Sequence, residues 1–277
     1  MERLCDCHND CLTKINNDKK LRKYLSSFKD NTMVLAVWTS KLDAITSINL
    51  MQKAKKLSFD NPNLLTSFED LHFLTTENLS MCVELNPNFV GPVWNEDNKL
   101  AGGAYGTSGL TRFGELALTK FEQHGTIIDT AHCNEKSFIN IAKLSNKPIF
   151  CSHTACYELC NSPRNLKDYQ LKIITESNGF VGICLVSNFL AGTNHCKLSD
   201  VVDHIEYFAT KFSIDNIGFG LDFFGTKHLP KGIKNYVDLS KLKPLFLKRG
   251  FSEEEISKIC YLNFKNYLSR VNFTENF

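Results

Sequence analysis

Apolar runs and amphipathic segments alternate along most of this 277-residue chain. Several apolar runs are continuous, which is typical of β-strands that helices cover on one side and that pack inside a sheet on the other. The segments between them place apolar side chains at helical spacing. Eight runs predict strands, namely Arg3–His8, Thr32–Trp38, Leu64–Phe68, Asn88–Trp94, Thr126–Thr130, Pro148–Ser152, Phe180–Val186 and Asn216–Asp222. The segments that predict helices are Leu110–Gln123, Lys136–Leu144, Asn165–Glu176, Asp200–Phe212, Val237–Lys248 and Ser252–Leu268.

Strands that alternate with helices in this way predict an α/β protein whose parallel sheet closes into a (β/α)8 TIM barrel. A doubly wound open sheet is the alternative. No Gly-x-Gly-x-x-Gly motif follows the first strand, so a dinucleotide-binding fold loses its main support. No linker or fixed-period repeat marks a second domain, and we expect one domain over residues 1–277. The glycine-rich loop Asn95–Gly109 is long enough to be an active-site loop.

Composition and charge limit the kinds of molecule that the protein is expected to bind. With 43% hydrophobic residues, 22% charged residues and a net charge of +2, the chain shows no sign of a nucleic-acid partner. No apolar stretch approaches the roughly 20 residues of a membrane helix, so no membrane contact is expected. The first residues lack the apolar core of a signal peptide, and eleven scattered cysteines predict buried, reduced thiols rather than disulfides. We therefore expect a cytoplasmic protein.

Polar residues stand where the predicted strands end. Chemistry in a barrel gathers at the C-terminal ends of the strands, so these side chains should share one rim. His8 and Asp10 are two positions apart and would face the same side of an extended chain. The other candidates are Glu69, His132, His153 and Asp222. Imidazoles and carboxylates together suit zinc or a similar first-row metal, and Glu69 fits a carboxylate that bridges two ions.

Each candidate alone also has a plainer interpretation. His132 and His153 could be hydrogen-bonded core histidines, Asp222 a helix N-cap, and Glu69 a solvated side chain at a strand end. The argument for a metal site is that all of them fall on one rim, and it depends on the predicted strand register. The other histidines follow no such pattern and are interpreted as surface or packing residues: His72, His124, His195, His204 and His228.

Taken together and in order, the motifs resemble the membrane (renal) dipeptidase family of zinc metallopeptidases, which belongs to the amidohydrolase-like metal-dependent barrels. The resemblance covers nearly the whole chain. It is carried by residues 6–10, 109–114, 128–132, 152–155, 162–166, 217–223, 249–256 and 263–264.

The resemblance implies a hydrolase with two zinc ions that cleaves the peptide bond of dipeptides by attack of a metal-bound hydroxide. His8 and Asp10 would bind one zinc, His132 and His153 the other, and Glu69 would bridge them. Asp222 matches the acid that carries the proton to the leaving amine. Arg164 matches the arginine that holds the substrate's carboxylate in its planar fork. The family also implies a homodimer.

Three departures from the family pattern leave the substrate open. Trp94, followed by Asn95, stands where mammalian members carry a substrate-contacting histidine, so we expect both residues to bind substrate. An indole N–H only donates; it could still donate to an oxyanion, but a changed substrate is an equal alternative. Phe224 replaces a second acid that often follows the last strand, and the membrane attachment of mammalian members is not carried over. Two readings therefore stay open beside the dipeptidase: an amidohydrolase acting on a cyclic or modified small amide, and a catalytically silent barrel that serves as a binding protein.

Overall fold

Eight parallel strands form the centre of the structure, a computed structural model that describes residues 3–28 and 31–271. The strands are β1 (Cys5–Asn9), β2 (Thr32–Trp38), β3 (Leu64–Glu69), β4 (Phe89–Gly91), β5 (Ile127–Ile128), β6 (Phe150–Thr154), β7 (Phe180–Ile183) and β8 (Ile217–Phe219). Their order in the sheet is β5-β4-β3-β2-β1-β8-β7-β6. A parallel bridge between Asp129 and Phe150 joins β5 to β6 and so brings the two edges together. The predicted (β/α)8 barrel is confirmed.

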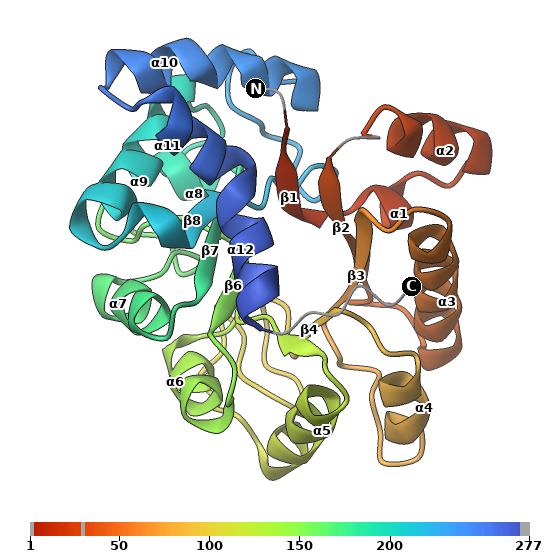
Figure 1. The fold of residues 1–277 in the computed structure, drawn as a ribbon. Helices are drawn as coiled ribbons and strands as arrows, with labels where there is room; N and C mark the ends of the chain where they lie inside the picture. The colour runs from red at the N-terminus through yellow and green to blue at the C-terminus, as the bar shows by residue number, and fades with distance from the viewer. Residues whose placement is uncertain (1–2, 29–30, 272–277) are drawn as a thin grey trace.

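Helices surround this ring of strands (Figure 1). They are α1 (Cys11–Lys14), α2 (Asp18–Ser26), α3 (Ala44–Asp60), α4 (Leu79–Glu84), α5 (Arg112–Gln123), α6 (Glu135–Leu144), α7 (Asp168–Glu176), α8 (Ser187–Ala191), α9 (Leu198–Lys211), α10 (Lys243–Lys248), α11 (Glu253–Ser257) and α12 (Asn263–Arg270). Two 3-10 segments, η1 (Ile214–Asn216) and η2 (Tyr236–Leu242), and a π-helical turn, η3 (Lys258–Leu262), complete them. Side-chain oxygens of Asp43, Thr111 and Asn134 accept backbone N–H groups at the starts of α3, α5 and α6, as expected of N-caps.

Four predicted strands run further toward the site than the observed β4, β5, β7 and β8, whereas β1, β3 and β6 end one or two residues later than predicted. Only β2 has the predicted bounds; the strand expected over Thr126–Thr130 is reduced to Ile127–Ile128. Beyond β5, the side chain of Asp129 accepts the backbone N–H groups of Ala131 and Ser152, so a side chain replaces the carbonyl acceptors of the sheet. β5 therefore ends where a polar side chain takes over the hydrogen bonding.

The helix predictions are correct in place but not in detail. The helix expected from Asn165 begins at Asp168, because Leu166 still pairs its backbone with Ala155. The segment expected as Val237–Lys248 is a 3-10 segment followed by α10, and Ser252–Leu268 is divided by the π-helical turn η3. The capping box of Ser252 and Glu255 is present. The prediction did not single out α1 to α4 or α8.

Aromatic rings fill the barrel at the N-terminal ends of its strands. Phe89, Phe150 and Phe180 stand at the starts of β4, β6 and β7 and pack with Phe264 and Tyr267 of α12. The Phe264 ring centroid lies 5.3 Å from that of Phe180 and 6.1 Å from that of Phe150. In Figure 1, α12 crosses in front of the strands. This helix closes one end of the barrel with apolar side chains and leaves the polar site to the other.

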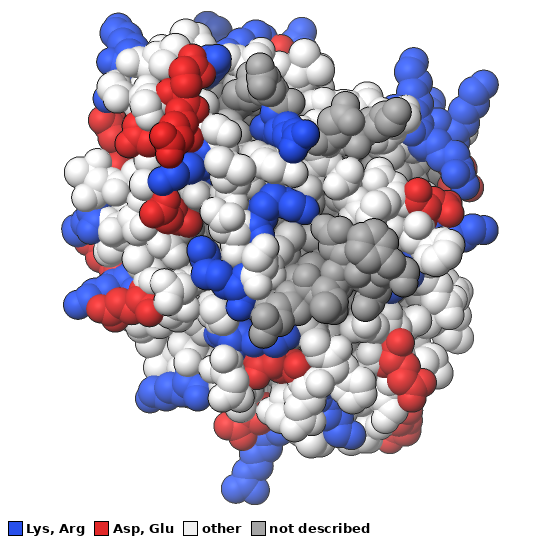
Figure 2. Space-filling view, viewed as in Figure 1, with Lys and Arg blue, Asp and Glu red and all other residues white. Residues whose placement is uncertain are grey.

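All eleven cysteines are buried and form no disulfide, as predicted. Within residues 3–28 and 31–271, no helix combines the length and the apolar character needed to cross a membrane. Acidic and basic side chains both occur around the face that carries α12 (Figure 2).

We expect Phe264→Ala to lower the free energy of unfolding by about 3–5 kcal/mol, because it leaves a cavity among buried rings. Urea denaturation followed by circular dichroism measures this change. Leu262→Ala is the matched control, since Leu262 is 39% exposed in the preceding turn. Equal losses in the two variants would contradict the role assigned to α12.

Candidate metal centre

Imidazole and carboxylate side chains from several strand ends converge on Glu69, the last residue of β3. Glu69 Oε1 lies 2.9 Å from His132 Nε2 and 3.9 Å from His153 Nε2. Glu69 Oε2 lies 3.3 Å from His8 Nε2, which in turn lies 3.6 Å from Asp10 Oδ2. The Nε2 atoms of His132 and His153 are 2.9 Å apart. The two oxygens of one carboxylate therefore face two different sets of side chains.

Two of the predicted site residues have a left-handed backbone. The φ angle is 66° at His132 and 57° at Asp222, in the segments that follow β5 and β8. His and Asp adopt this conformation more readily than most side chains, yet it still costs roughly 1–3 kcal/mol at each position. Gly225 follows closely, and a Cβ there would clash with Oδ1 of Asp222 and Oδ2 of Asp10. The chain thus turns sharply at the barrel mouth and brings Asp222 against Asp10.

Hydrogen bonds on the far side of two rings fix their orientation. His132 Nδ1 lies 2.9 Å from Asn95 Oδ1, and His153 Nδ1 lies 2.8 Å from Ser152 Oγ. An amide oxygen only accepts, so Nδ1 of His132 carries the proton and its Nε2 presents a lone pair to the cluster. A partner of this kind orients a histidine that binds a metal. Asn95 belongs to the loop that follows β4, which the sequence predicted as an active-site loop.

Burial and local charge keep two of the histidines neutral. Burial, followed by the Arg164 guanidinium, lowers the pKa of His132 to about 3. Burial and the neighbouring imidazoles also place the pKa of His153 well below its usual value. Neutral imidazole is the form that binds metal ions.

The acidic groups of the cluster have shifted pKa values as well. Burial and the adjacent Asp10 raise the pKa of Asp222 well above its usual value. Burial also acts to raise the pKa of Glu69, but the His8 and His132 imidazoles outweigh it and hold that pKa below the usual range. The central carboxylate is therefore ionised, and Asp222 at the edge holds a proton more readily.

The donor set fits a divalent metal. Both ring nitrogens of His8 and Oδ1 of Asp10 are buried without a hydrogen-bond partner, which costs about 1–3 kcal/mol for each unsatisfied group. Among the described residues, three groups offer one ligand atom per residue with all of these atoms within 4.8 Å of one another: His8, Asp10 and Glu69; Glu69, His132 and His153; and His8, Asp129 and His153. The first two share Glu69, and their nitrogen and carboxylate ligands are those that zinc takes in proteins.

Sequence reasoning missed Asp129 and Trp38. Asp129 is buried, accepts two backbone N–H groups and belongs to the third ligand group. Its position three residues before His132 was the available signal. Trp38 ends β2, and its ring packs edge-on against Trp94 at 5.5 Å, while Trp94 lies 5.9 Å from the His132 ring. Two indoles therefore flank the cluster on the β2 and β4 side.

The remaining predicted residues lie as follows. Arg164 is 4% exposed and donates from Nη2 to the backbone carbonyl of His153 at 3.3 Å. Phe224 packs edge-on against Tyr24 at 5.1 Å and belongs to none of the ligand groups. Asp222 does not cap a helix, which excludes one plainer interpretation of this residue.

The other histidines are surface or packing residues, as predicted. His204 is buried and takes up both ring nitrogens, one with the N–H of Cys156 and one with the carbonyl of Leu190. His72 lies 3.3 Å from Asp70 beside the site, without joining a ligand group. The exposed ones are His124, His195 and His228.

A closed parallel barrel with imidazoles and carboxylates gathered at the C-terminal ends of its strands is the architecture of a metal-dependent hydrolase. Within that class, the sequence model of the membrane dipeptidase family (peptidase family M19) matches residues 7–276. The chain belongs to this family and is a metallopeptidase of the dipeptidase type.

The chain is also similar to one curated protein and to several solved structures. A curated but uncharacterised protein encoded in the pqqA 5′ region of Klebsiella pneumoniae is 29% identical over 194 residues, which cover 66% of this chain and 71% of that protein. A metallopeptidase from Rhodobacter sphaeroides, solved with a phosphinate mimic of the dipeptide L-Ala-D-Ala, superposes with a TM-score of 0.85 at 20% identity, covering 97% of this chain and 99% of the other. An amidohydrolase from Pseudomonas aeruginosa gives a TM-score of 0.82 at 22% identity, covering 97% and 96%. At these identities, the two solved structures support the fold.

We expect Asn95→Ala to weaken metal binding by roughly 10- to 100-fold, because His132 loses the group that orients it. Competition with a chromogenic chelator measures the affinity. Asn95→Asp keeps an acceptor oxygen and should retain most of the affinity. If the Ala and Asp variants bound metal equally well, the orienting role of Asn95 would be wrong.

Proposed function

We propose that the protein is a dipeptidase with two zinc ions that hydrolyses a dipeptide and releases its C-terminal amino acid. The observation that carries this proposal is the position of Glu69, whose two oxygens face two separate ligand sets. His8 and Asp10 would hold one zinc, His132 and His153 the other, and Glu69 would bridge them. When bound, zinc supplies Lewis acidity toward the scissile carbonyl and lowers the pKa of water at the site.

Asp222 is the group that we propose to move the proton. Its carboxylate lies against Asp10 at the edge of the cluster, and burial together with Asp10 raises its pKa. A carboxyl group with a raised pKa accepts a proton from the attacking water and donates it to the leaving amine. This assignment uses an acid that is close to the ligands but is absent from the three ligand groups.

Arg164 is the group that we propose to bind the substrate's carboxylate. Its guanidinium is buried, and among the described residues its Nε has no hydrogen-bond partner and its side chain donates only to a neutral carbonyl. A planar fork of this kind holds a carboxylate through two parallel hydrogen bonds. Trp94 and Asn95 would contact the substrate on the opposite side, with the Trp94 indole N–H as a donor only.

The Trp94 indole also favours a second candidate, a hydrolase of a cyclic or modified small amide. An indole cannot accept or exchange a proton as an imidazole can, so a different carbonyl compound remains compatible with this position. Amino-acid release from a panel of L-L and L-D dipeptides decides between the two candidates. A cytoplasmic location and a homodimer stay predictions.

We expect His153→Ala to lower the zinc content from about two ions to about one per chain and to reduce kcat by at least roughly 100-fold. Metal analysis after gel filtration and dipeptide turnover measure the two effects. His195→Ala, at an exposed histidine, is the control. If His153→Ala kept both metal ions and its turnover, the assignment of His153 as a metal ligand would be wrong.

We expect Arg164→Ala to lower kcat/KM roughly 10- to 100-fold on dipeptides with a free C-terminal carboxylate, because a charge-assisted hydrogen-bond pair is lost. The matching C-terminal amides should change little. An equal loss on acids and amides would show that Arg164 acts on the fold or the metals rather than on the carboxylate.

A further inference from the structure

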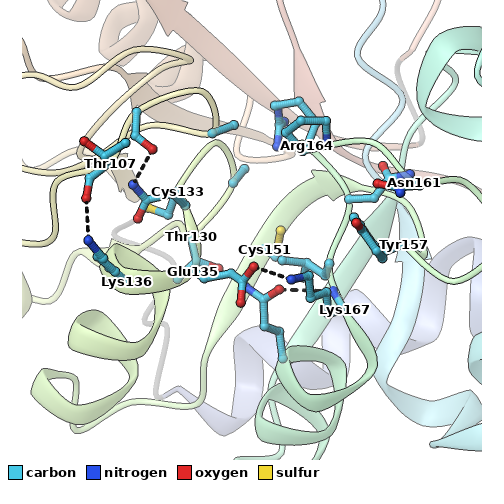
Figure 3. A pocket seen from close by; sticks show the side chains of 18 residues that line it. Thr107, Thr130, Cys133, Glu135, Lys136, Cys151, Tyr157, Asn161, Arg164 and Lys167 are labelled. Carbon is cyan, nitrogen blue, oxygen red and sulfur yellow. Dashed lines mark hydrogen bonds and ion pairs between the residues drawn. The ribbon is translucent and has the colours of Figure 1, made fainter.

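A cavity of about 420 Å³ opens beside the metal centre, between the start of α6, the start of α7 and the loops that follow β4, β5 and β6 (Figure 3). Ala131 and Cys133, which flank His132 in sequence, line it, and so does Cys151, two residues before His153. Its volume lies within the usual range of small-molecule sites, roughly 300–1,000 Å³. Of the residues used in the proposed function, only Arg164 lines this cavity.

Arg164 connects the cavity to the metal centre. Its Nη2 donates to the carbonyl of the ligand residue His153, and its buried Nε has no hydrogen-bond partner. Arg164 lines the cavity together with Cys133 and Cys151. A substrate whose carboxylate is held by Arg164 therefore has its C-terminal residue next to this cavity.

The cavity carries more positive than negative charge. Lys167 and Glu135 form an ion pair across it, and the second oxygen of Glu135 accepts the hydroxyl of Tyr169 at 2.8 Å, so this acid is fully engaged (Figure 3). Lys136 donates only to the carbonyl of Thr107, at 2.8 Å. Among the described residues, neither Lys136 nor Arg164 forms an ion pair with a carboxylate. Two cations thus face the cavity without a compensating acid.

We propose that this cavity receives the side chain of the leaving C-terminal residue and selects acidic side chains. The α-carboxylate would bind Arg164, and the side-chain carboxylate would lie near Lys136. The small side chains that line the cavity, Ala131, Cys133 and Cys151, would leave room for the methylene groups. A basic side chain would instead meet two like charges. The inference rests on the proposed dipeptidase function and names the substrate class of that site.

The test compares isosteric substrates that differ in one charge. We measure kcat/KM on Ala-Glu and Ala-Gln, each with an L- and a D-configured C-terminal residue. The expected preference for Glu is about threefold to fivefold, the upper range for an exposed ion pair, and it should shrink at high salt. Lys136→Met should bring the Glu/Gln ratio to about one, and Lys136→Glu should invert it. Lys143→Met makes the same charge change in the last turn of α6, outside the cavity, and should keep the ratio.

The outcomes separate this inference from the proposed function. Cleavage of Ala-Gln and Ala-Glu at equal rates in the wild type would overturn the acidic preference and leave the dipeptidase standing. If no dipeptide were cleaved, the dipeptidase proposal would be overturned. Calorimetric titration of the zinc-loaded protein with free glutamate and free glutamine would then test whether the cavity prefers an acidic side chain. Tighter binding of glutamate that Lys136→Met abolishes would support an acidic site. Equal binding of the two amino acids would overturn it.

Discussion

The interaction on which the rest of the site depends is the contact of one buried, ionised carboxylate, Glu69, with imidazoles on both sides. Removing a charge from water is expensive unless partners compensate for it. In the described structure His8 lies 3.3 Å from this carboxylate, but neutral His132 turns a lone pair toward it, and Asp10 and Asp222 add further acidic groups nearby. Divalent cations would relieve the repulsion among these acids and satisfy the open nitrogens of His8. Metal binding and the stability of this end of the barrel are therefore coupled.

The two ends of the barrel have different roles, one in stability and the other in the polar site. At the N-terminal ends of the strands, stacked rings and α12 form an apolar plug without buried charges among its members. At the C-terminal ends, the chain accepts left-handed backbone at His132 and Asp222 and leaves polar atoms unsatisfied. The packing of this apolar end stabilises the fold and offsets the free-energy cost of the strained polar end. This division is the usual one in barrels of this kind, where function lies at the carboxyl ends of the strands and stability at the other face.

The sequence predicted the barrel and the identity of the converging residues, because strand periodicity and strand ends are local properties. It failed where contacts join distant parts of the chain. Asn95 hydrogen-bonds His132, and the Asp129 side chain accepts the backbone N–H of Ser152. Neither pairing can be predicted from the spacing of these residues in the sequence. The shortness of β5 has the same origin, since a side chain rather than a strand carbonyl takes the next hydrogen bonds. The left-handed angle at His132 was not predicted either, because histidine tolerates this conformation but does not require it.

The two flanks of the ligand cluster differ in chemistry. On the β2 and β4 side, Trp94 packs against Trp38, and the Lys14 ammonium lies 4.2 Å above the Trp38 ring. The Trp38 indole N–H is buried without a partner and is a donor facing no acceptor in the described residues. On the β6 side stands the Arg164 guanidinium, which has no acidic partner there. The metal centre thus lies between an aromatic wall and a cationic one, so a bound molecule is oriented by its apolar and anionic ends. In the proposed function the ligand residues would determine the type of chemistry, and this asymmetry would determine which end of the substrate lies on which side.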